Sequence, residues 1–283
     1  MRQFVSEKGL DSNFCLTVEG KKAHYLSSVL RLVAGDMIYV RLPDSSLQPM
    51  TVAKIDSEKK TVLLQVAGEV LPSDSDKHQL LNGNHALPQT KSFPIEFWLF
   101  MFAAKPSKMD LIVRQAAECG VLHFVPVEGD FCQKSSIESA IKKSSEFDPR
   151  WSRIVTEALE QSGSSVATQV NQAMDLKSAL ELWKKNSTNA DLALVLYEQT
   201  AKTKNLHRAV LDFAGDLKKI ERCALFVGAE GGISPTEIDF LRDNNVVPIH
   251  FETNILRCET AALYGLAAIQ NVLREMDVWR LKE

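Results

Sequence analysis

The chain has 283 residues, of which 45% are hydrophobic and 24% are charged, a balance typical of a globular protein with a sizeable core. Its net charge of −3 argues against a protein coated with positive charge for non-specific nucleic-acid binding, and is compatible with a local basic patch. We expect a cytoplasmic protein without membrane contact, because no apolar run is long enough to span a bilayer and the N-terminus lacks the apolar centre of a signal peptide.

The five cysteines are dispersed along the chain and form neither a CxxC pair nor a zinc-type spacing with histidine. This pattern indicates reduced, mostly structural thiols and predicts no metal site. The cysteines are Cys15, Cys119, Cys132, Cys223 and Cys258.

Residues 1–70 are expected to form a small β-rich domain. Apolar residues recur at helical spacing over 24–32, and a glycine-containing turn follows at 34–36. Short runs of branched and aromatic residues then predict three strands, which suggests a small barrel around one helical turn. The predicted strands are 37–42, 50–55 and 61–66.

Residues 71–94 are rich in proline, glycine and small polar residues, which predicts a linker or a long loop. A structured insertion over part of this stretch is the alternative.

From residue 95 to 283, near-continuous apolar strands alternate with amphipathic helices. This alternation predicts an α/β domain with a parallel sheet covered by helices on both faces. The expected strands are 95–103, 121–128, 190–198, 223–228 and 246–251, and the expected helices are 108–120, 151–163, 234–244 and 259–276.

A glycine-rich loop, "GAEGGISPTE", follows the strand predicted at 223–228. Ser234, Pro235 and Glu237 match the N-cap, the first helical position and the reciprocal acid of a capping box, so a helix is expected to fix the end of the loop.

The chemistry of this loop disfavours a phosphate ligand. It has neither the Lys-Ser/Thr of a Walker A loop nor GxGxxG spacing, and Glu230 would repel a phosphate. An uncharged adenosine or a cationic sulfonium tolerates the acid. The plainer interpretation is a tight turn that needs positive φ at two glycines.

A second segment, "NILRCETA" at 254–261, places Arg257 and Glu259 on either side of Cys258 just before the last predicted helix. An arginine at such a junction is most often a salt-bridge partner. Taken together, however, the two segments resemble the SPOUT class of RNA methyltransferases, in which G-x-E-G-G is followed along the chain by I-L-R-x-E-T-A. Within that class the chain is similar to the RsmE family, which methylates N3 of a uridine in small-subunit ribosomal RNA.

Further segments, in the same order, carry the resemblance over nearly the whole chain. They are Arg2 with Phe4, His24 with "VLRL", Gly35-Asp36, "KPSKMD" at 105–110 running into "ECGV" at 118–121, and "EQSG" at 160–163. The resemblance implies a PUA-like RNA-binding barrel followed by a SPOUT domain with a C-terminal trefoil knot.

The resemblance also implies the ligand and the residues around it. S-adenosyl-L-methionine is the implied cofactor, and the RNA is expected to contact cations of both domains. The alternative is a solvated surface charge for each lysine and a packed helix residue for His24. The implied cofactor residues are Leu196, Glu198, Gly228, Ala229, Glu230, Gly231, Gly232, Phe251, Ile255, Leu256, Arg257, Thr260 and Ala261, and the candidate RNA-binding residues are Arg2, His24, Arg31, Lys105, Lys108 and Arg114.

The candidate catalytic residues are Arg257, Glu230 and Glu259. Methyl transfer to a ring nitrogen needs alignment but no metal and no covalent protein intermediate. The Arg257 fork suits the two ring oxygens of a developing uracil anion, and either acid is a candidate acceptor of the N3 proton. The alternative for each acid, favoured for Glu259, is a structural role, and Cys258 is interpreted as structural.

The chain departs from the family pattern at four places. Ala229 replaces a proline, 252–254 read Glu-Thr-Asn instead of Gly-Pro-Arg, Ser164 replaces an arginine, and "GDFCQKSS" at 129–136 replaces Glu-Arg-Ser. The last two changes remove cations that would contact RNA phosphates.

We expect ribosomal RNA or the small ribosomal subunit as the partner and a homodimer as the assembly. SPOUT proteins usually act as dimers, and the last helix carries extra small apolar surface at Ala261, Ala262, Ala267 and Ala268. Two alternatives stay open, namely a SPOUT methyltransferase with another RNA target and a non-catalytic RNA-binding ribosome assembly factor. A nucleotide-binding enzyme unrelated to methylation is disfavoured because a phosphate-binding signature is missing.

Overall fold

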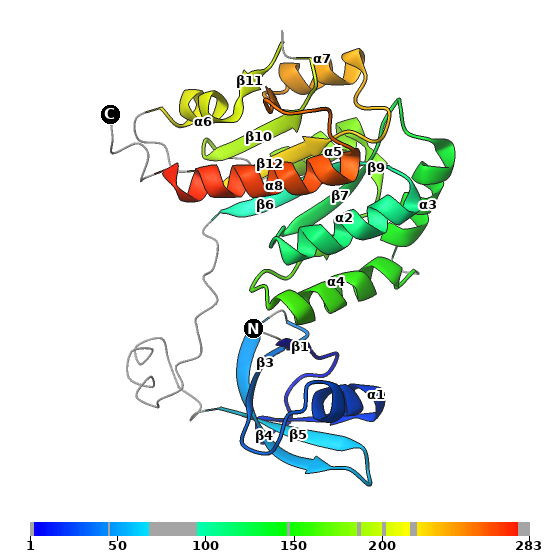
Figure 1. Ribbon diagram of the computed structural model, residues 1–283, viewed down its shortest axis with the longest axis vertical. Coiled ribbons are helices and arrows are strands. Elements are labelled where there is room, and N and C mark those ends of the chain that lie inside the picture. The colour runs from blue at the N-terminus through cyan, green and yellow to red at the C-terminus, as the bar shows by residue number, and fades with distance from the viewer. Residues whose placement is uncertain are drawn as a thin grey trace. The chain divides into compact units, whose positions relative to one another are not determined.

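The computed structural model describes residues 3–44, 46–67, 95–145, 148–185, 188–199, 202–215 and 220–276. The chain divides into two compact units. The first contains the described residues up to 67 together with 159–165, and the second contains the other described residues from 95 onward (Figure 1). The linker expected at 71–94 lies outside the described residues, so the predicted domain boundaries stay predictions.

The first unit is built on a five-stranded sheet with the order β1-β3-β4-β5-β2. The β1–β3 pair is parallel and the other pairs are antiparallel. The sequence predicted β3, β4 and β5 and missed the two short outer strands. The strands are β1 (Gln3–Val5), β2 (Cys15–Glu19), β3 (Met37–Arg41), β4 (Leu47–Asp56) and β5 (Thr61–Val66).

The helix expected over 24–32 begins earlier and changes its pitch. Helix α1 (Gly20–His24) continues into the π-helical turn η1 (Tyr25–Val29), and the backbone leaves it at Arg31 with a φ of 56°. Leu26 is fully buried and anchors this helical segment to an apolar core. The core residues are Phe4, Leu16, Val18, Ala23, Leu26, Ile38, Val40, Met50, Val52, Val62 and Leu64.

Residues 159–165 join this unit through hydrogen bonds to the sheet. Gln3 Nε2 donates to the carbonyl oxygens of Leu159, at 2.7 Å, and of Ser164, at 3.1 Å. Arg41 Nη2 donates to the same Ser164 carbonyl at 2.8 Å. No local sequence pattern predicts this association.

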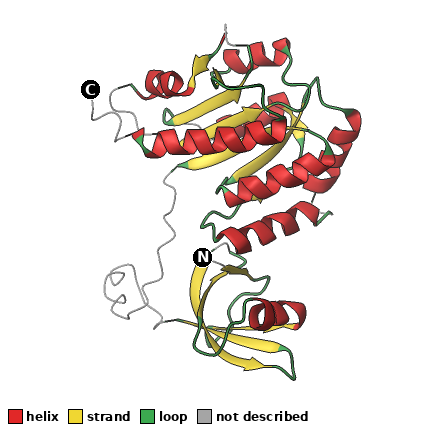
Figure 2. Cartoon of the chain, viewed as in Figure 1, coloured by secondary structure: helices red, strands yellow, loops and turns green. Residues whose placement is uncertain are grey.

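The second unit is an eight-stranded sheet in which every pair is parallel, as Figure 2 shows in yellow. The order is β11-β13-β10-β12-β6-β7-β8, and β9 also pairs with β7. The central strands are almost continuously buried, which explains their unbroken apolar sequences. The strands are β6 (Glu96–Phe102), β7 (His123–Glu128), β8 (Gln169–Val170), β9 (Met174–Asp175), β10 (Asp191–Leu196), β11 (Lys204–Asn205), β12 (Arg222–Val227) and β13 (Val247–His250).

Helices cover both faces of this sheet. In Figure 1, α2 and α8 lie in front of the sheet and α5 lies behind it. The sequence predicted α2, α4, α7 and α8 and missed α3, α5 and α6. The helices are α2 (Pro106–Glu118), α3 (Lys134–Ser144), α4 (Arg150–Ser162), α5 (Leu176–Lys184), α6 (Leu206–Ala214), α7 (Pro235–Asp243) and α8 (Cys258–Arg274).

Two of the missed helices carry a local start signal. Asp175 accepts a hydrogen bond from Ser178 N at the start of α5, and Asn205 accepts one from Arg208 N at the start of α6. Asp and Asn at the N-cap are recognisable in a sequence, so these two helices were predictable in principle.

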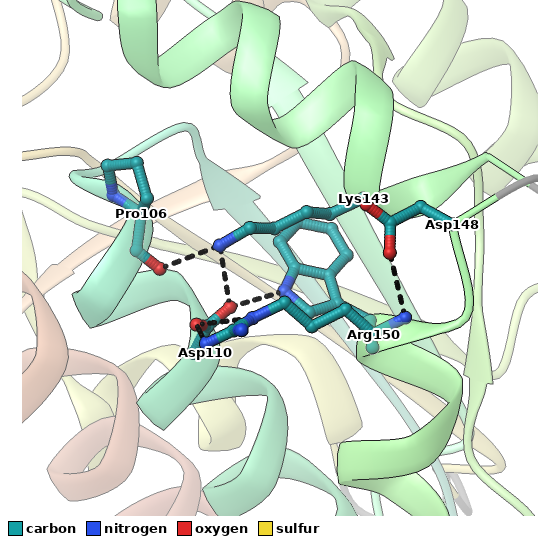
Figure 3. A network of polar contacts seen from close by, with 6 residues as sticks. Pro106, Asp110, Lys143, Asp148 and Arg150 are labelled. Carbon is teal, nitrogen blue, oxygen red and sulfur yellow. Dashed lines mark hydrogen bonds and ion pairs between the residues drawn. The ribbon is translucent and has the colours of Figure 1, made fainter.

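A half-buried carboxylate fixes α2 against its neighbours (Figure 3). Asp110 accepts hydrogen bonds from Lys143 Nζ at 2.9 Å, from Arg150 Nη2 at 2.6 Å and from Trp151 Nε1 at 2.9 Å. Burial alone would raise the pKa of Asp110, but Arg150, Lys143 and Trp151 hold it below the ordinary value. The network ties α3 and the start of α4 to α2, the helix that carries Lys108.

Candidate active site at the carboxyl ends of the parallel strands

Four neighbouring strands end at one edge of the second unit. β13, β10, β12 and β6 are adjacent and parallel, so the segments that follow them meet there. These segments are 251–257, 197–199, 228–233 and 103–105. All predicted cofactor residues lie on the first three segments, at the last residue of β10 or in the first turn of α8, so the fold brings them to one edge.

The glycine loop is tight because its backbone approaches other groups closely. A Cβ on Gly228 would lie 2.8 Å from the carbonyl carbon of Gly232, and one on Gly231 would lie 2.9 Å from Phe131 Cβ. Only Gly232 among the loop glycines has a positive φ, of 77°. The expectation of positive φ at two glycines is therefore wrong. Gly228 and Gly231 are needed for close approach, and only Gly232 for its backbone conformation.

The predicted capping box at the end of this loop is confirmed. Ser234 Oγ accepts from Glu237 N at 3.2 Å, and Glu237 Oε2 accepts from Ser234 N at 2.8 Å. The segment after β7 shares the box, because Ser234 Oγ donates to Asp130 Oδ2 at 2.7 Å and Asp130 N donates to Glu237 Oε1 at 2.8 Å. No local sequence pattern predicts this role of Asp130.

An ion-pair cluster connects the glycine loop to the start of α8. Lys108 Nζ lies 3.3 Å from Glu230 Oε1 and 3.0 Å from Glu259 Oε2. Glu230 Oε1 also accepts from Lys105 N at 3.2 Å. The sequence proposed Lys108 as an RNA contact, and the structure places it between both candidate acids.

These contacts set the protonation of the cluster. The hydrogen bond with Glu259 raises the pKa of Lys108, and Glu230 contributes to the rise. Burial opposes ionisation of Glu230 and Glu259, but backbone N–H groups and Lys108 hold the pKa of both acids below the ordinary value. At neutral pH the cluster therefore contains two carboxylates and one ammonium.

The Cys258 thiol lies beside this cluster and stays protonated. Its side chain is buried, and its Sγ donates to Glu259 Oε2 at 3.3 Å. Burial and the hydrogen bond with Glu259 raise the pKa of Cys258 to about 12. A neutral thiol is a weak nucleophile, which supports the structural interpretation.

The exposed groups at this edge come from the segment between β13 and α8. Ile255 is 84% exposed, and Arg257, the N-cap residue of α8, is exposed without an ion pair to any described residue. Leu196, at the end of β10, and Leu256 are half-buried. Both apolar and cationic groups are thus accessible beside the glycine loop.

The other predicted cofactor residues show a range of exposure. Ala229 is buried, Phe251 and Ala261 are half-buried, and Glu198 and Thr260 are exposed. The Phe251 ring packs edge-on against Tyr264 of α8, with 5.0 Å between centroids.

The candidate RNA-binding residues belong to different units. His24 and Arg31 are exposed in the first unit, and His24 Nδ1 lies 3.1 Å from Ser28 Oγ. Lys105 and Arg114 are exposed at the N-cap and on the surface of α2 in the second unit. Arg2 lies outside the described residues.

Comparison with known proteins identifies the family. A family model described as "RNA methyltransferase domain" matches residues 91–270. The chain belongs to this family. It is 26% identical to ribosomal RNA small subunit methyltransferase E 2 of Borreliella burgdorferi, over 98% of this chain and 100% of the relative. It is 25% identical to ribosomal RNA small subunit methyltransferase E of Bacillus subtilis, over 89% and 88%.

A solved structure of this RNA methyltransferase type supports the fold. Ribosomal RNA small subunit methyltransferase E from Neisseria gonorrhoeae, bound to S-adenosyl methionine, has a TM-score of 0.69 at 20% identity, over 96% of this chain and 98% of that one. The predicted resemblance to the RsmE family and the predicted α/β fold with a parallel sheet are thereby confirmed, and the trefoil knot stays a prediction. No helix in the described part of the RNA methyltransferase is long and apolar enough to cross a membrane.

Proposed function

We propose that this RNA methyltransferase uses S-adenosyl-L-methionine to methylate N3 of a uridine in small-subunit ribosomal RNA. The observation that carries the proposal is the Glu230–Lys108–Glu259 cluster, which joins the glycine loop to the start of α8 beside the exposed Arg257. The relatives named for small-subunit ribosomal RNA methylation support the substrate class.

The edge of the sheet fits this cofactor by charge and by shape. Two carboxylates and one ammonium give the cluster a net charge of −1, which favours a cationic sulfonium and disfavours a phosphate. Gly228, Gly231 and Gly232 keep side chains out of the loop, and Leu196 and Leu256 offer apolar surface. When bound, S-adenosyl-L-methionine supplies an electrophilic methyl group.

Arg257 is the residue that we assign to the reacting base. Loss of the N3 proton places negative charge on the uracil ring and its two oxygens, and a guanidinium fork can donate to both. Arg257 is available for this role because its side chain is exposed at the N-cap of α8 and forms no ion pair with described residues.

We assign Glu230 and Glu259 mainly to charge and geometry. A carboxylate with a lowered pKa is a weak base, so both acids are poor proton acceptors at neutral pH. They hold Lys108 between the loop and α8, and the N3 proton leaves to solvent.

The assembly and the RNA contacts complete the proposal. We assign RNA binding to the first unit through His24 and Arg31 and to the second through Lys105, with ribosomal RNA or the small subunit as the partner. A homodimer is proposed through α8, where Tyr264 is 46% exposed. Ala262 is buried within the chain and cannot contribute to that surface, whereas Ala267 is exposed.

Calorimetric titration with S-adenosylhomocysteine tests the cofactor site. Gly232→Ala forces a Cβ onto a residue with a φ of 77° inside the loop, and Gly20→Ala does the same at 63° in the first unit. We expect wild type and Gly20→Ala to bind with similar affinity and Gly232→Ala to bind at least about tenfold more weakly. No binding by wild type, or equal loss in both variants, would contradict the proposed site.

A methylation assay with small-subunit particles and transfer RNA as parallel substrates tests the target. The proposal predicts methyl incorporation into the particles alone. Incorporation into transfer RNA alone would support the alternative RNA target, and incorporation into neither would support the assembly-factor alternative.

A further inference from the structure

The segment after β7 carries an exposed aromatic residue beside the glycine loop. Phe131 is 50% exposed, although it is one of the larger apolar side chains of the second unit. Gly231 touches it so closely that a Cβ there would lie 2.9 Å from Phe131 Cβ and 3.1 Å from its carbonyl oxygen. The Phe131 side chain therefore branches from the backbone directly beside the glycine loop of the candidate active site.

The backbone on both sides of Phe131 is held in place. Asp130 N donates to Glu237 Oε1 at 2.8 Å, and Cys132 N donates to the Gly129 carbonyl at 3.0 Å. A Cβ on Gly129 would overlap the Phe102 ring at 2.3 Å, so this segment is also packed against the end of β6. The backbone is therefore held on both sides of Phe131, while half of the Phe131 side chain stays exposed.

Two exposed lysines belong to the segments on either side of the Glu230 carboxylate and Phe131. Lys105 is the N-cap residue of α2 and its backbone N–H contacts Glu230, and Lys134 is the first residue of α3, three positions after Phe131. Both lysines are exposed, and neither forms an ion pair with a described residue. Protein–protein interfaces are depleted of lysine, whereas single-stranded RNA is bound by aromatic rings combined with cations.

We propose that Phe131 stacks on an unpaired base of the RNA substrate and holds it beside the glycine loop. The inference rests on the proposed function, because it names a residue that presents the RNA to that same site. Stacking requires only a ring face, so it positions a base without reading its identity. Lys105 and Lys134 would contact the phosphates on either side of that base.

The test combines a substitution in the protein with removal of the bases from the RNA. The affinity of a short labelled oligouridine, and of an abasic oligomer of the same length, is measured by fluorescence anisotropy with S-adenosylhomocysteine present. The proteins are wild type, Phe131→Ala, Phe131→Trp and Phe240→Ala. Phe240 is a matched control, because it is a phenylalanine of the same unit, is 36% exposed and lies on α7.

We expect Phe131→Ala to weaken oligouridine binding by about 5- to 100-fold, the range for loss of one stacked base, and Phe131→Trp to retain it. The loss should vanish with the abasic oligomer, and Phe240→Ala should behave as wild type. Equal affinity of wild type and Phe131→Ala for oligouridine, or an equal loss with both oligomers, would overturn the proposal. A change in the oligomeric mass of Phe131→Ala without loss of RNA affinity would also overturn it, in favour of a subunit contact.

The parallel methylation assay separates the two proposals. If wild type methylates small-subunit particles but Phe131→Ala shows no base-dependent loss, only the stacking role is wrong. If the base-dependent loss appears but the particles are not methylated, the target is wrong and the stacking role stands.

Discussion

The two ends of the parallel sheet in the second unit use their side chains in opposite ways. At the amino end, aromatic and charged side chains pack against one another. Trp98 stacks on His123 with 3.8 Å between centroids, and the Arg222 guanidinium lies 4.3 Å from the Trp183 ring centroid. Arg222 Nη1 also lies 2.9 Å from Asp191 Oδ2, and the Asp191 side chain is only 2% exposed.

A cavity of about 800 Å³ lies beside this amino end, and its position and lining do not indicate a ligand site. It is lined by the starts of β10 and β13 and by the ends of α5 and α7. Two of the charged groups along it have partners, because Lys204 lies 2.6 Å from Asp212 and Arg242 Nη2 donates to the Lys202 carbonyl at 2.8 Å. The cavity also lies away from the strand ends where open parallel sheets bind ligands.

At the carboxyl end, several groups are left available. The exposed residues there are Arg257, Ile255, Phe131 and Lys105. Side chains therefore stabilise this sheet at its amino end and are available for binding and chemistry at its carboxyl end. Substitutions at the amino end should therefore reduce stability, and those at the carboxyl end should reduce activity.

Arg257→Ala should give the largest effect on activity. Loss of the donor to the developing anion should lower kcat by about 10²- to 10³-fold, while the thermal midpoint and the affinity for S-adenosylhomocysteine stay near wild type. Single-turnover methyl transfer at saturating RNA measures the loss. Full turnover by Arg257→Lys would contradict the role of the guanidinium fork.

Arg222→Ala should give the largest loss of stability. It leaves Asp191 buried without its cation and removes the contact with the Trp183 ring, so we expect a loss of about 3 kcal/mol in the free energy of unfolding. Urea denaturation measures it. The folded variant should keep kcat within about threefold, and a large loss of kcat with unchanged stability would reverse the proposed division between the two ends.

Asp110→Asn should reduce stability by about 1–3 kcal/mol at neutral pH, because Lys143, Arg150 and Trp151 lose a charged acceptor. The folded-state pKa of Asp110 is lowered, so its stabilisation is present above the ordinary carboxyl pKa and disappears as pH falls through the folded value.

Urea denaturation at a series of pH values from neutral to acidic checks this direction. The free energies of unfolding of wild type and Asp110→Asn should converge at low pH. Asp239→Asn is a matched control, because Asp239 pairs with Arg242 on the surface at 3.2 Å and should contribute less than about 1 kcal/mol. Curves that stay parallel down to low pH would contradict the account of Asp110.

Lys108→Met should shift the pH dependence of activity. Lys108 lowers the pKa of Glu230 and of Glu259, so the acid limb of wild type lies below the ordinary carboxyl range. Without the ammonium both pKa values rise and the acid limb moves to higher pH, with a loss of kcat/KM of about tenfold. Lys105→Met is the control, because only the backbone of Lys105 contacts Glu230. An acid limb that moves equally in both variants would count against the cluster.

Cys258→Ser should give the smallest effect. The thiol is protonated and donates one hydrogen bond to Glu259, which a hydroxyl can replace, so kcat/KM should change by less than about threefold. A loss of several hundredfold, or a covalent adduct of wild type with RNA that contains 5-fluorouridine, would restore the nucleophilic alternative.

The parts of the site that could be predicted are those that a short run of neighbouring residues specifies. Four letters, Ser234 to Glu237, specify the capping box, and apolar runs specify the strands that converge at the site. The close contacts were not predictable, because Gly231 meets Phe131 and Lys108 meets Cys258 150 residues away in the sequence. The contacts of Arg222 with Trp183 and Asp191 were not predictable for the same reason, because both partners are distant from Arg222 in the sequence.

The most direct test of the central claim is to incubate the protein with S-adenosyl-L-methionine that carries a labelled methyl group and with small-subunit particles, and then to locate the label by nucleoside analysis. We expect label on N3 of a uridine of the particle RNA, reduced by about 10²-fold or more in Arg257→Ala. Label on another atom or another RNA, or full labelling by Arg257→Ala, would contradict it.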